Sequence, residues 1–256
     1  MNQKVALTCD LNGTLEQLTS LCNAMEEFNV RGTFLVSPKL PAAGKGSYGG
    51  RPDEEKQFKL LMDKRHEVCS HTFSHPFDMT ALSPKDMESD IIKGHESLVS
   101  SFSKYNKSFK IQGFRAPAQV FDERAFPVFE KLGYTWDSSQ VYFPALGKPF
   151  EPLLYGSILE IPVLFPNDSA LLDKYRLPTE KEETVLKQAF DASKKYFVFT
   201  VHPFCTARND KNLGVLHNVL KYMQNQKSEF LTLSEMAEEI KRSEPNIVRV
   251  AANTKA

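Results

Sequence analysis

Two histidines stand four residues apart in the segment Glu67–Asp78, EVCSHTFSHPFD, among serine, threonine and aromatic residues. On a helix or in a tight loop, this spacing brings two imidazoles to one side, where neutral ring nitrogens bind a divalent cation about 2.0–2.1 Å away. His71 and His75 are therefore candidate metal ligands. A bare HxxxH pair also arises by chance or caps a turn, so the rest of the sequence has to support a metal site.

Alternating strand and helix patterns surround these histidines. Short runs rich in β-branched and aromatic residues predict the strands Lys4–Cys9, Arg31–Val36, Glu67–Ser70, Ile111–Arg115, Thr135–Asp137, Leu159–Pro162 and Tyr196–His202. Apolar residues at helical spacing predict the helices Leu15–Phe28, Glu54–Arg65, Pro84–Phe102, Asp122–Leu132, Lys181–Ser193, Gly214–Asn225 and Ser234–Lys241. Such alternation predicts a parallel sheet covered on the outside by helices. This many units in 256 residues favour an α/β barrel in a single domain, residues 1–256.

Two irregular regions interrupt the alternation. Pro38–Pro52 is rich in glycine, proline and lysine, and Tyr142–Tyr155 is rich in proline and aromatic residues. Both are predicted to be long surface loops. Because loops after barrel strands carry binding and catalysis, they are expected either to line a substrate groove or to be solvent-exposed connectors.

Composition excludes several classes of partner. The 32 basic residues balance 32 acidic ones, so no overall field attracts nucleic acid or an anionic membrane. No run of about eighteen apolar residues predicts a membrane-spanning helix, and no signal peptide is recognisable, so the cytoplasm is the expected location. The four cysteines lack CxxC spacing, which favours reduced thiols; they are Cys9, Cys22, Cys69 and Cys205.

Five polar residues share one position relative to the predicted strands. Each lies at or just beyond the carboxyl end of a strand; they are Asp10, His71, Arg115, Asp137 and His202. Parallel barrel strands bring their carboxyl ends to one rim, where the active sites of such barrels lie. The alternative is that each residue caps a turn or is solvated independently of the others. This explains any one residue but requires five separate explanations. The pattern therefore predicts one shared site.

These residues fall in five motifs through which the chain resembles the polysaccharide deacetylase family, the NodB-homology or carbohydrate esterase group. The motifs are LTCDLN, HTFSHP, FRAP, GYTWDSS and FTVHP, and they span nearly the whole chain. The resemblance implies a distorted (β/α)7 barrel, with seven strands rather than eight. The form GYTWDSS, together with ILEIPV at Ile158–Val163, resembles the branch that includes cytoplasmic peptidoglycan and O-antigen deacetylases and allantoinase-like proteins.

The resemblance also implies roles for individual residues. Hydrolysis of an amide needs a nucleophilic water, a Lewis acid, a base and an acid for the departing amine. In the family pattern the base is Asp10 and the acid is His202. Arg115 is expected to orient Asp10, and Asp137 to pair with His202 or Arg115 and adjust its protonation. The alternatives are a structural ion pair for Arg115 and a cap in an Asp-Ser-Ser turn for Asp137.

The first motif departs from the family pattern. Many members read Asp-Asp or Asp-x-Asp, with the second carboxylate binding metal, whereas Leu11 and Asn12 occupy these positions here. An amide oxygen binds a cation more weakly than a carboxylate does. Either Asn12 completes a weaker site with the two histidines, or Asp10 becomes the third ligand, or no metal is bound. A turn residue before Gly13 is the structural alternative for Asn12.

The sequence therefore predicts a metal-dependent hydrolase of non-peptide C–N bonds that deacetylates an N-acetylated sugar or glycan precursor. Zinc is the expected cation, and cobalt, nickel or iron suit the same ligands. Two alternatives remain: a cyclic-amide or formamide hydrolase of the allantoinase-like kind, and a catalytically silent carbohydrate-binding homologue. The expected partner is a small-molecule or glycan substrate, without nucleic acid or membrane.

Overall fold

The computed structural model describes residues 2–39, 53–244 and 246–250. The strands are β1 (Lys4–Asp10), β2 (Thr33–Val36), β3 (Glu67–Ser70), β4 (Gly113–Phe114), β5 (Trp136–Asp137), β6 (Val141–Tyr142), β7 (Leu153–Tyr155), β8 (Ile158–Glu160), β9 (Val163–Leu164), β10 (Tyr196–Val201), β11 (Glu229–Phe230) and β12 (Val248–Val250). The helices are α1 (Leu15–Glu27), α2 (Glu54–Asp63), α3 (Pro84–Phe102), α4 (Phe126–Leu132), α5 (Thr179–Ala192), α6 (Pro203–Thr206), α7 (Asp210–Asn225) and α8 (Leu233–Ser243). Apart from its first two residues, the predicted loop Pro38–Pro52 lies outside the described residues.

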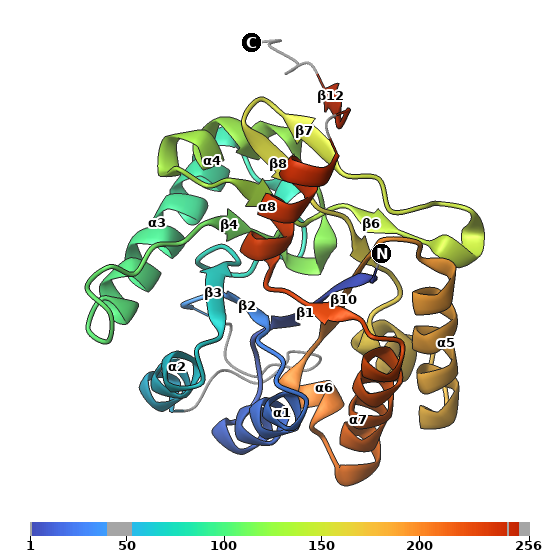
Figure 1. The fold of residues 1–256 in the computed structure, drawn as a ribbon. Coiled ribbons are helices and arrows are strands. Elements are labelled where there is room, and N and C mark those ends of the chain that lie inside the picture. The colour runs from blue at the N-terminus through green and yellow to red at the C-terminus, as the bar shows by residue number, and fades with distance from the viewer. Residues whose placement is uncertain (1, 40–52, 245, 251–256) are drawn as a thin grey trace.

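All the strands given above except β6 and β9 form one curled sheet, with the order β10-β1-β2-β3-β4-β5-β8-β7-β12 and with β11 paired to β1 (Figure 1). Within the described residues, the seven strands from β10 to β8 in this order run parallel, and β7 is antiparallel to β8. Helices α1, α2, α5 and α7 lie on the outside of this half-barrel. The predicted fold class, a distorted (β/α)7 barrel, is confirmed.

A small parallel ribbon, β6 paired with β9, lies beside β10. The hydroxyl of Tyr142 on β6 accepts a hydrogen bond from the backbone N–H of Val198 at 3.3 Å and lies 3.4 Å from its carbonyl oxygen. Between β8 and β10 the barrel is therefore completed by the β6–β9 ribbon and the buried Tyr142 side chain. It is not completed by continuous strand pairing.

The region Tyr142–Tyr155 is not the simple surface loop that was predicted. Leu153–Tyr155 forms β7, with Leu154 opposite Leu159 of β8. The nearby prolines remove backbone donors, which is why the segment resembles a loop in the sequence. Part of the region also lines a groove with Tyr196 at the amino end of β10, away from the polar residues predicted to form the site.

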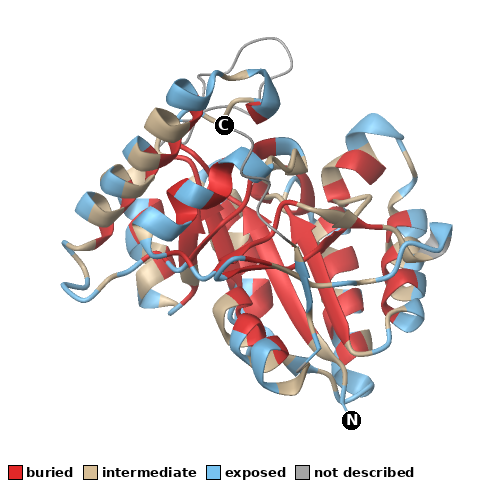
Figure 2. Cartoon of the chain, turned by 90° about the horizontal axis from the view of Figure 1, so that it is seen from above, coloured by how far each residue is buried: buried red, intermediate tan, exposed pale blue. Residues whose placement is uncertain are grey.

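The outer helices follow local sequence signals. Helix α3 has the predicted bounds: Ser83 caps it by accepting a hydrogen bond from Asp86 N–H at 3.2 Å, and Pro84 occupies the first turn, where no N–H is needed. Its buried side chains face inward. Figure 2 shows the same division throughout the molecule, with buried strands and exposed outer faces of the helices.

Helix α8 covers the amino ends of the strands. Leu233 N–H donates to the Thr33 hydroxyl at 2.8 Å, at the start of β2. The Trp136 indole N–H donates to the Ser234 hydroxyl at 2.9 Å, at the start of β5, and Ser234 in turn donates to Glu67 at the start of β3. These contacts cover the amino ends of β2, β3 and β5.

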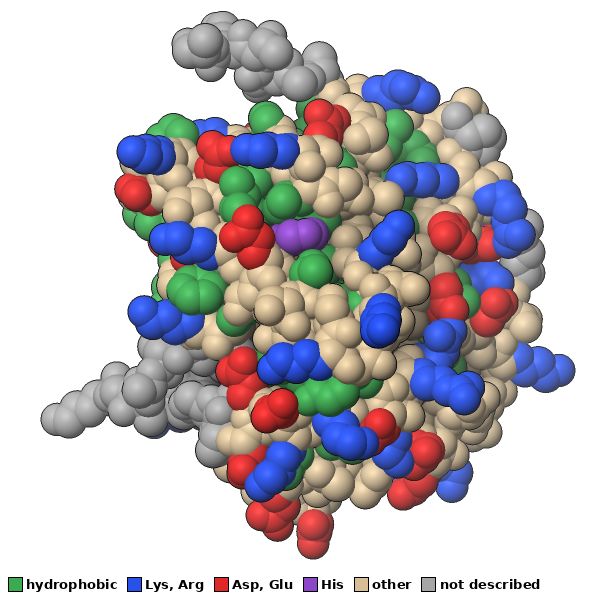
Figure 3. Space-filling model, turned by 90° about the vertical axis from the view of Figure 1, so that its left-hand side faces the viewer, with side chains coloured by type: hydrophobic (Ala, Val, Ile, Leu, Met, Phe, Trp, Pro, Cys, Tyr) green, Lys and Arg blue, Asp and Glu red, His purple; other side chains and the backbone are tan. Residues whose placement is uncertain are grey.

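The surface agrees with the balanced charge of the sequence. On the face in Figure 3, basic and acidic side chains are interspersed rather than gathered by sign. All four cysteines are free and buried. Among the described residues, the structure contains no helix with the length and apolar character needed to span a membrane.

Candidate active site

The polar residues at the strand ends meet around one cavity of about 460 Å³. Asp10 ends β1, His71 follows β3 and His202 follows β10, so neighbouring parallel strands bring all three to the same rim. Asn12 and His75 also line this cavity. Arg115, which follows β4, lies fully buried beneath it. The structure therefore brings together the predicted site residues except Asp137.

Arg115 holds one side of Asp10. Its Nη1 donates to Asp10 Oδ1 at 3.0 Å and lies 2.8 Å from the hydroxyls of Thr8 and Thr200. The rest of the guanidinium donates to Ser138, from Nε to the carbonyl oxygen at 2.8 Å and from Nη2 to the hydroxyl at 3.0 Å. Contacts with five oxygen atoms fix the planar fork, so the orientation of the Asp10 carboxylate is fixed with it.

Two histidines lie against the other oxygen of Asp10. Oδ2 is 3.8 Å from His71 Nε2 and 3.8 Å from His202 Nε2. Burial by itself would raise the pKa of Asp10, but His71, Arg115 and His202 together lower it below its usual value. Asp10 is therefore an ionised carboxylate with one oxygen directed at two imidazoles.

His71 is fixed in one tautomer. Its Nδ1 donates to the carbonyl oxygen of Arg115 at 2.8 Å, which leaves Nε2 with a lone pair. Burial lowers the pKa of His71 to about 3, so the ring is neutral at physiological pH. A neutral imidazole whose other nitrogen donates to a carbonyl is the usual state of a metal-binding histidine.

The second histidine of the pair lies close by. The His71 and His75 rings are 5.0 Å apart between centroids, at an interplanar angle of 71°. His75 has a φ of 55° and Thr72 a φ of 66°, so two residues of this short segment are left-handed without being glycine. The HxxxH spacing is thus realised in a tight loop rather than on a helix.

The donor atoms fit a weakly bound divalent cation. Among the described residues, Asn12 Oδ1 and His71 Nε2 are buried without a hydrogen-bond partner, and both residues line the cavity. Two imidazoles and an amide oxygen suit a borderline metal such as zinc, although less strongly than a set with a carboxylate. In the described part of the chain, no three side chains of His, Cys, Asp or Glu are arranged to hold a metal. Asn12 Oδ1 thus has no competing hydrogen bond among the described residues, whereas Arg115 donates to one oxygen of Asp10.

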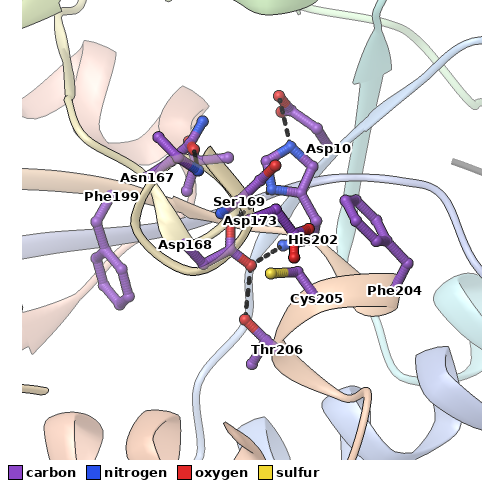
Figure 4. A network of polar contacts seen from close by, with 12 residues as sticks. Asp10, Asn167, Asp168, Ser169, Asp173, Phe199, His202, Phe204, Cys205 and Thr206 are labelled. Carbon is purple, nitrogen blue, oxygen red and sulfur yellow. Dashed lines mark hydrogen bonds and ion pairs between the residues drawn. The ribbon is translucent and has the colours of Figure 1, made fainter. Parts of the chain in front are cut away.

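His202 is paired with a residue that the sequence analysis did not identify. Its Nδ1 lies 2.6 Å from Asp168 Oδ1, and its backbone N–H donates to Oδ2 at 2.8 Å (Figure 4). The Thr206 hydroxyl also donates to Asp168, at 2.7 Å. Burial would lower the pKa of His202, but Asp168 and then Asp10 raise it above its usual value. Figure 4 shows the ring between these two carboxylates, with one nitrogen directed at each.

Asp137 is not bonded to His202, one of its two predicted partners, but it interacts with Arg115, the other, whose charge opposes the rise in the pKa of Asp137 on burial. The carboxylate bonded to His202 is Asp168. Asp137 accepts a hydrogen bond from the Ser139 hydroxyl at 2.8 Å, which agrees with the alternative prediction of a cap in an Asp-Ser-Ser turn. It lies opposite Glu160 of β8, and burial raises the pKa of both carboxyls.

Glu160 was also missed, although the sequence carried a signal. A carboxylate inside the apolar run ILEIPV has to be paired or protonated once the strand is buried. Glu160 accepts a hydrogen bond from Gln140 N–H at 2.7 Å, and its pKa is raised by burial and by Asp137. Burial thus favours the protonated forms of these carboxyls, while the charge of Arg115 acts in the opposite direction on both.

Comparison with known proteins identifies the family and the fold. The family model described as polysaccharide deacetylase matches residues 2–136, just over half of the chain, so the chain belongs to this family and the predicted family is confirmed. The matched part includes Asp10, His71, His75 and Arg115 but ends before His202. A search of curated proteins finds no match.

Solved structures share the fold at low sequence identity. A probable polysaccharide deacetylase from Pseudomonas aeruginosa PAO1 is 14% identical with a TM-score of 0.73, over 94% of this chain and 92% of that one. A putative polysaccharide deacetylase from Mycobacterium smegmatis is 15% identical with a TM-score of 0.71, over 93% and 91%. A CE4 family pseudoenzyme from Bacillus anthracis is 13% identical with a TM-score of 0.63, over 93% and 66%. A mutant of that pseudoenzyme is described as having restored enzymatic activity.

Proposed function

We propose that this protein is a metal-dependent hydrolase of non-peptide C–N bonds that removes the acetyl group from an N-acetylated sugar or glycan precursor in the cytoplasm. The observation that carries the proposal is the environment of Asp10. One of its oxygens is held by Arg115, and the other lies 3.8 Å from both His71 and His202 at the wall of a cavity. Membership of the polysaccharide deacetylase family supports the choice of reaction.

His71, His75 and Asn12 are the residues that would hold the cation, with zinc as the first choice and cobalt, nickel or iron as others. A bound divalent cation supplies Lewis acidity, which polarises the scissile carbonyl and lowers the pKa of the attacking water. The alternative ligand, Asp10, is the less favourable choice because Arg115 already occupies one of its oxygens.

Asp10 and His202 divide the proton transfers. The Asp10 carboxylate is ionised, and its Oδ2 is the oxygen left to accept a proton from water. His202 carries a raised pKa because Asp168 stabilises its protonated form, so its Nε2 proton is available for the departing amine. Arg115 keeps the base in place, and Asp168 keeps the acid in place.

The cavity favours a small substrate or one unit of a longer glycan. Its volume of about 460 Å³ falls within the range of about 300–1,000 Å³ that is typical of small-ligand sites. Phe77 and Phe165 contribute apolar surface to its wall, beside the polar ends of Gln119, Asn167 and Ser169. A mixed lining of this kind suits a sugar ring with its acetamido group directed at Asp10.

The test is release of acetate by zinc-loaded protein from a panel of N-acetylated mono- and oligosaccharides and nucleotide-linked sugars. Activity that is lost in Asp10→Asn and His202→Gln supports the proposal. Cyclic amides and formamides belong in the same panel, since turnover of these alone would identify an allantoinase-like hydrolase instead. No turnover of any amide, with zinc bound, would contradict the proposed reaction.

A specific observation favours a second candidate, a catalytically silent carbohydrate-binding protein. Asn12 stands where many family members have a metal-binding carboxylate, and the fold also occurs in the Bacillus anthracis pseudoenzyme. Asn12→Asp separates the two cases. If this variant gains hydrolysis sharply over the native chain, the native protein is a binder or a weakened enzyme; if it loses activity, Asn12 is tuned for catalysis.

A further inference from the structure

The segment that carries His71 and His75 leaves β3 in an unusual conformation. Thr72 and His75 both have left-handed backbone angles, which cost free energy for any residue other than glycine. Only part of the support comes from the segment itself, where the Thr72 hydroxyl accepts a hydrogen bond from His75 N–H at 3.1 Å. A strained conformation persists only when surrounding groups hold it.

Helix α3 supplies such a group. Oδ2 of Asp90 accepts a hydrogen bond from Phe73 N–H at 3.1 Å. Ser74 N–H donates to both carboxylate oxygens, at 3.2 Å to Oδ1 and 3.3 Å to Oδ2. These two residues lie between the histidines in the sequence. Consecutive N–H groups that converge on one carboxylate form charge-assisted hydrogen bonds, which are stronger than neutral ones.

The same face of α3 approaches the segment closely at Gly94. Positions 90 and 94 are one helical turn apart and therefore share a face. A Cβ atom at position 94 would lie 2.7 Å from the Thr72 carbonyl carbon and 2.9 Å from Phe73 N, which is too close for either backbone atom. The absence of a side chain at Gly94 thus lets Asp90 reach the two N–H groups.

We propose that Asp90, with Gly94 beside it, is a positioning residue that holds the 71–75 segment so that both imidazoles face the cavity. The inference deepens the proposed function and rests on it for the role of the imidazoles as ligands. Asp90 itself does not touch the cavity. Its effect on a bound cation is carried by the backbone between the two histidines.

The test uses the full-length protein and three variants. Asp90→Asn removes the charge and leaves one acceptor oxygen instead of two for the two N–H donors, and Gly94→Ala pushes the segment away from the helix. Asp86→Asn is the matched control, because it removes the same charge from the same helix one turn earlier, where Asp86 is hydrogen-bonded to Ser83 in the cap of the helix. Two quantities are measured: zinc affinity by competition with a chromophoric chelator, and hydrogen exchange of the Phe73 and Ser74 amides without metal.

Asp90→Asn is expected to weaken zinc binding about tenfold or more, in line with the loss of other groups that support metal ligands. The two amides should exchange faster in this variant than in the native chain, and Gly94→Ala should act in the same direction. Asp86→Asn should change neither quantity. Native exchange and native zinc affinity in Asp90→Asn would overturn the inference.

The same measurements in the Asn12→Asp background keep the two proposals apart. If the native chain binds no zinc, the proposed function fails. The variant background then decides whether Asp90 positions the imidazoles, because amide exchange reports on the segment without metal. Compared with Asn12→Asp alone, faster amide exchange and weaker zinc binding in the double variant Asn12→Asp/Asp90→Asn would sustain the inference independently of the proposed function. Unchanged exchange would overturn it.

Discussion

The pairing of His202 with Asp168 makes a quantitative prediction for Asp168→Asn. The variant keeps the shape of the side chain but removes its charge from a contact of 2.6 Å to Nδ1. Hydrogen bonds to charged groups contribute about 1.5–3 kcal/mol, against about 0.5–1.5 kcal/mol for neutral ones. The protonated form of His202 therefore loses about 1–2 kcal/mol, which corresponds to about one pKa unit.

The direction follows from the contacts. Asp168 raises the pKa of His202, so its stabilising effect is present while the ring is protonated and is lost as pH rises through that pKa. In Asp168→Asn the ring loses its proton at lower pH. The alkaline limb of the pH profile of kcat/KM should then move down by about one unit, because His202 donates a proton to the leaving amine.

Nuclear magnetic resonance titration of the His202 ring gives the pKa directly, and the pH profile gives its consequence. Asp173→Asn is the control, since Asp173 lines the same cavity but pairs with Arg208 at 2.8 Å. The reasoning is refuted if His202 titrates at the same pH in Asp168→Asn as in the native protein, or if Asp173→Asn shifts it equally.

Three further predictions concern buried charges. Arg115→Met should lower the free energy of unfolding in urea by about 3–5 kcal/mol, because Asp10 is left buried without its partner; a stability equal to native would contradict this. Glu160→Gln should stay within about 1 kcal/mol of native in the same assay, since a neutral amide replaces a protonated carboxyl, whereas Glu160→Ala should be several-fold more destabilising. Burial raises the pKa of Glu182 to about 8, so its contribution to stability is present below its ordinary pKa of 4.5 and is lost as pH rises through 8. Native protein should therefore lose Tm between pH 6 and pH 9 relative to Glu182→Gln, and parallel Tm curves would show that Glu182 titrates normally.

Local signals in the sequence were sufficient to predict most of the framework. Capping at Ser83 and Pro84 defines the start of α3, and the period of its apolar residues defines its inner face. Short strands were harder to delimit. Ile111–Arg115 was predicted as a strand, but the strand is only Gly113–Phe114, and the chain turns at Pro117–Gln119 soon afterwards. Gln112 and Arg115 each add one backbone hydrogen bond beyond its ends, to Thr135 and Ser70.

The site was predictable where it depends on strand ends and not where it depends on the approach of distant turns. Asp10, His71 and His202 meet because parallel strands end at one rim. Asp168 lies 34 residues before His202 in the sequence, in a turn after β9 whose path has no periodic signal. From the sequence alone, an aspartate in such a turn is interpreted as a local turn cap. Its contact with the His202 imidazole follows only from the folded structure.

Metal content tests the central claim most directly. Tag-free protein purified without chelators is analysed by mass spectrometry, with His71→Ala alongside and with added zinc as a second condition. The proposed site predicts about one transition metal per chain in the native protein, and its loss in the variant, because His71 supplies one of only a few ligand atoms. A native chain that remains free of metal when offered zinc would contradict the hydrolase as proposed and favour the silent binding protein.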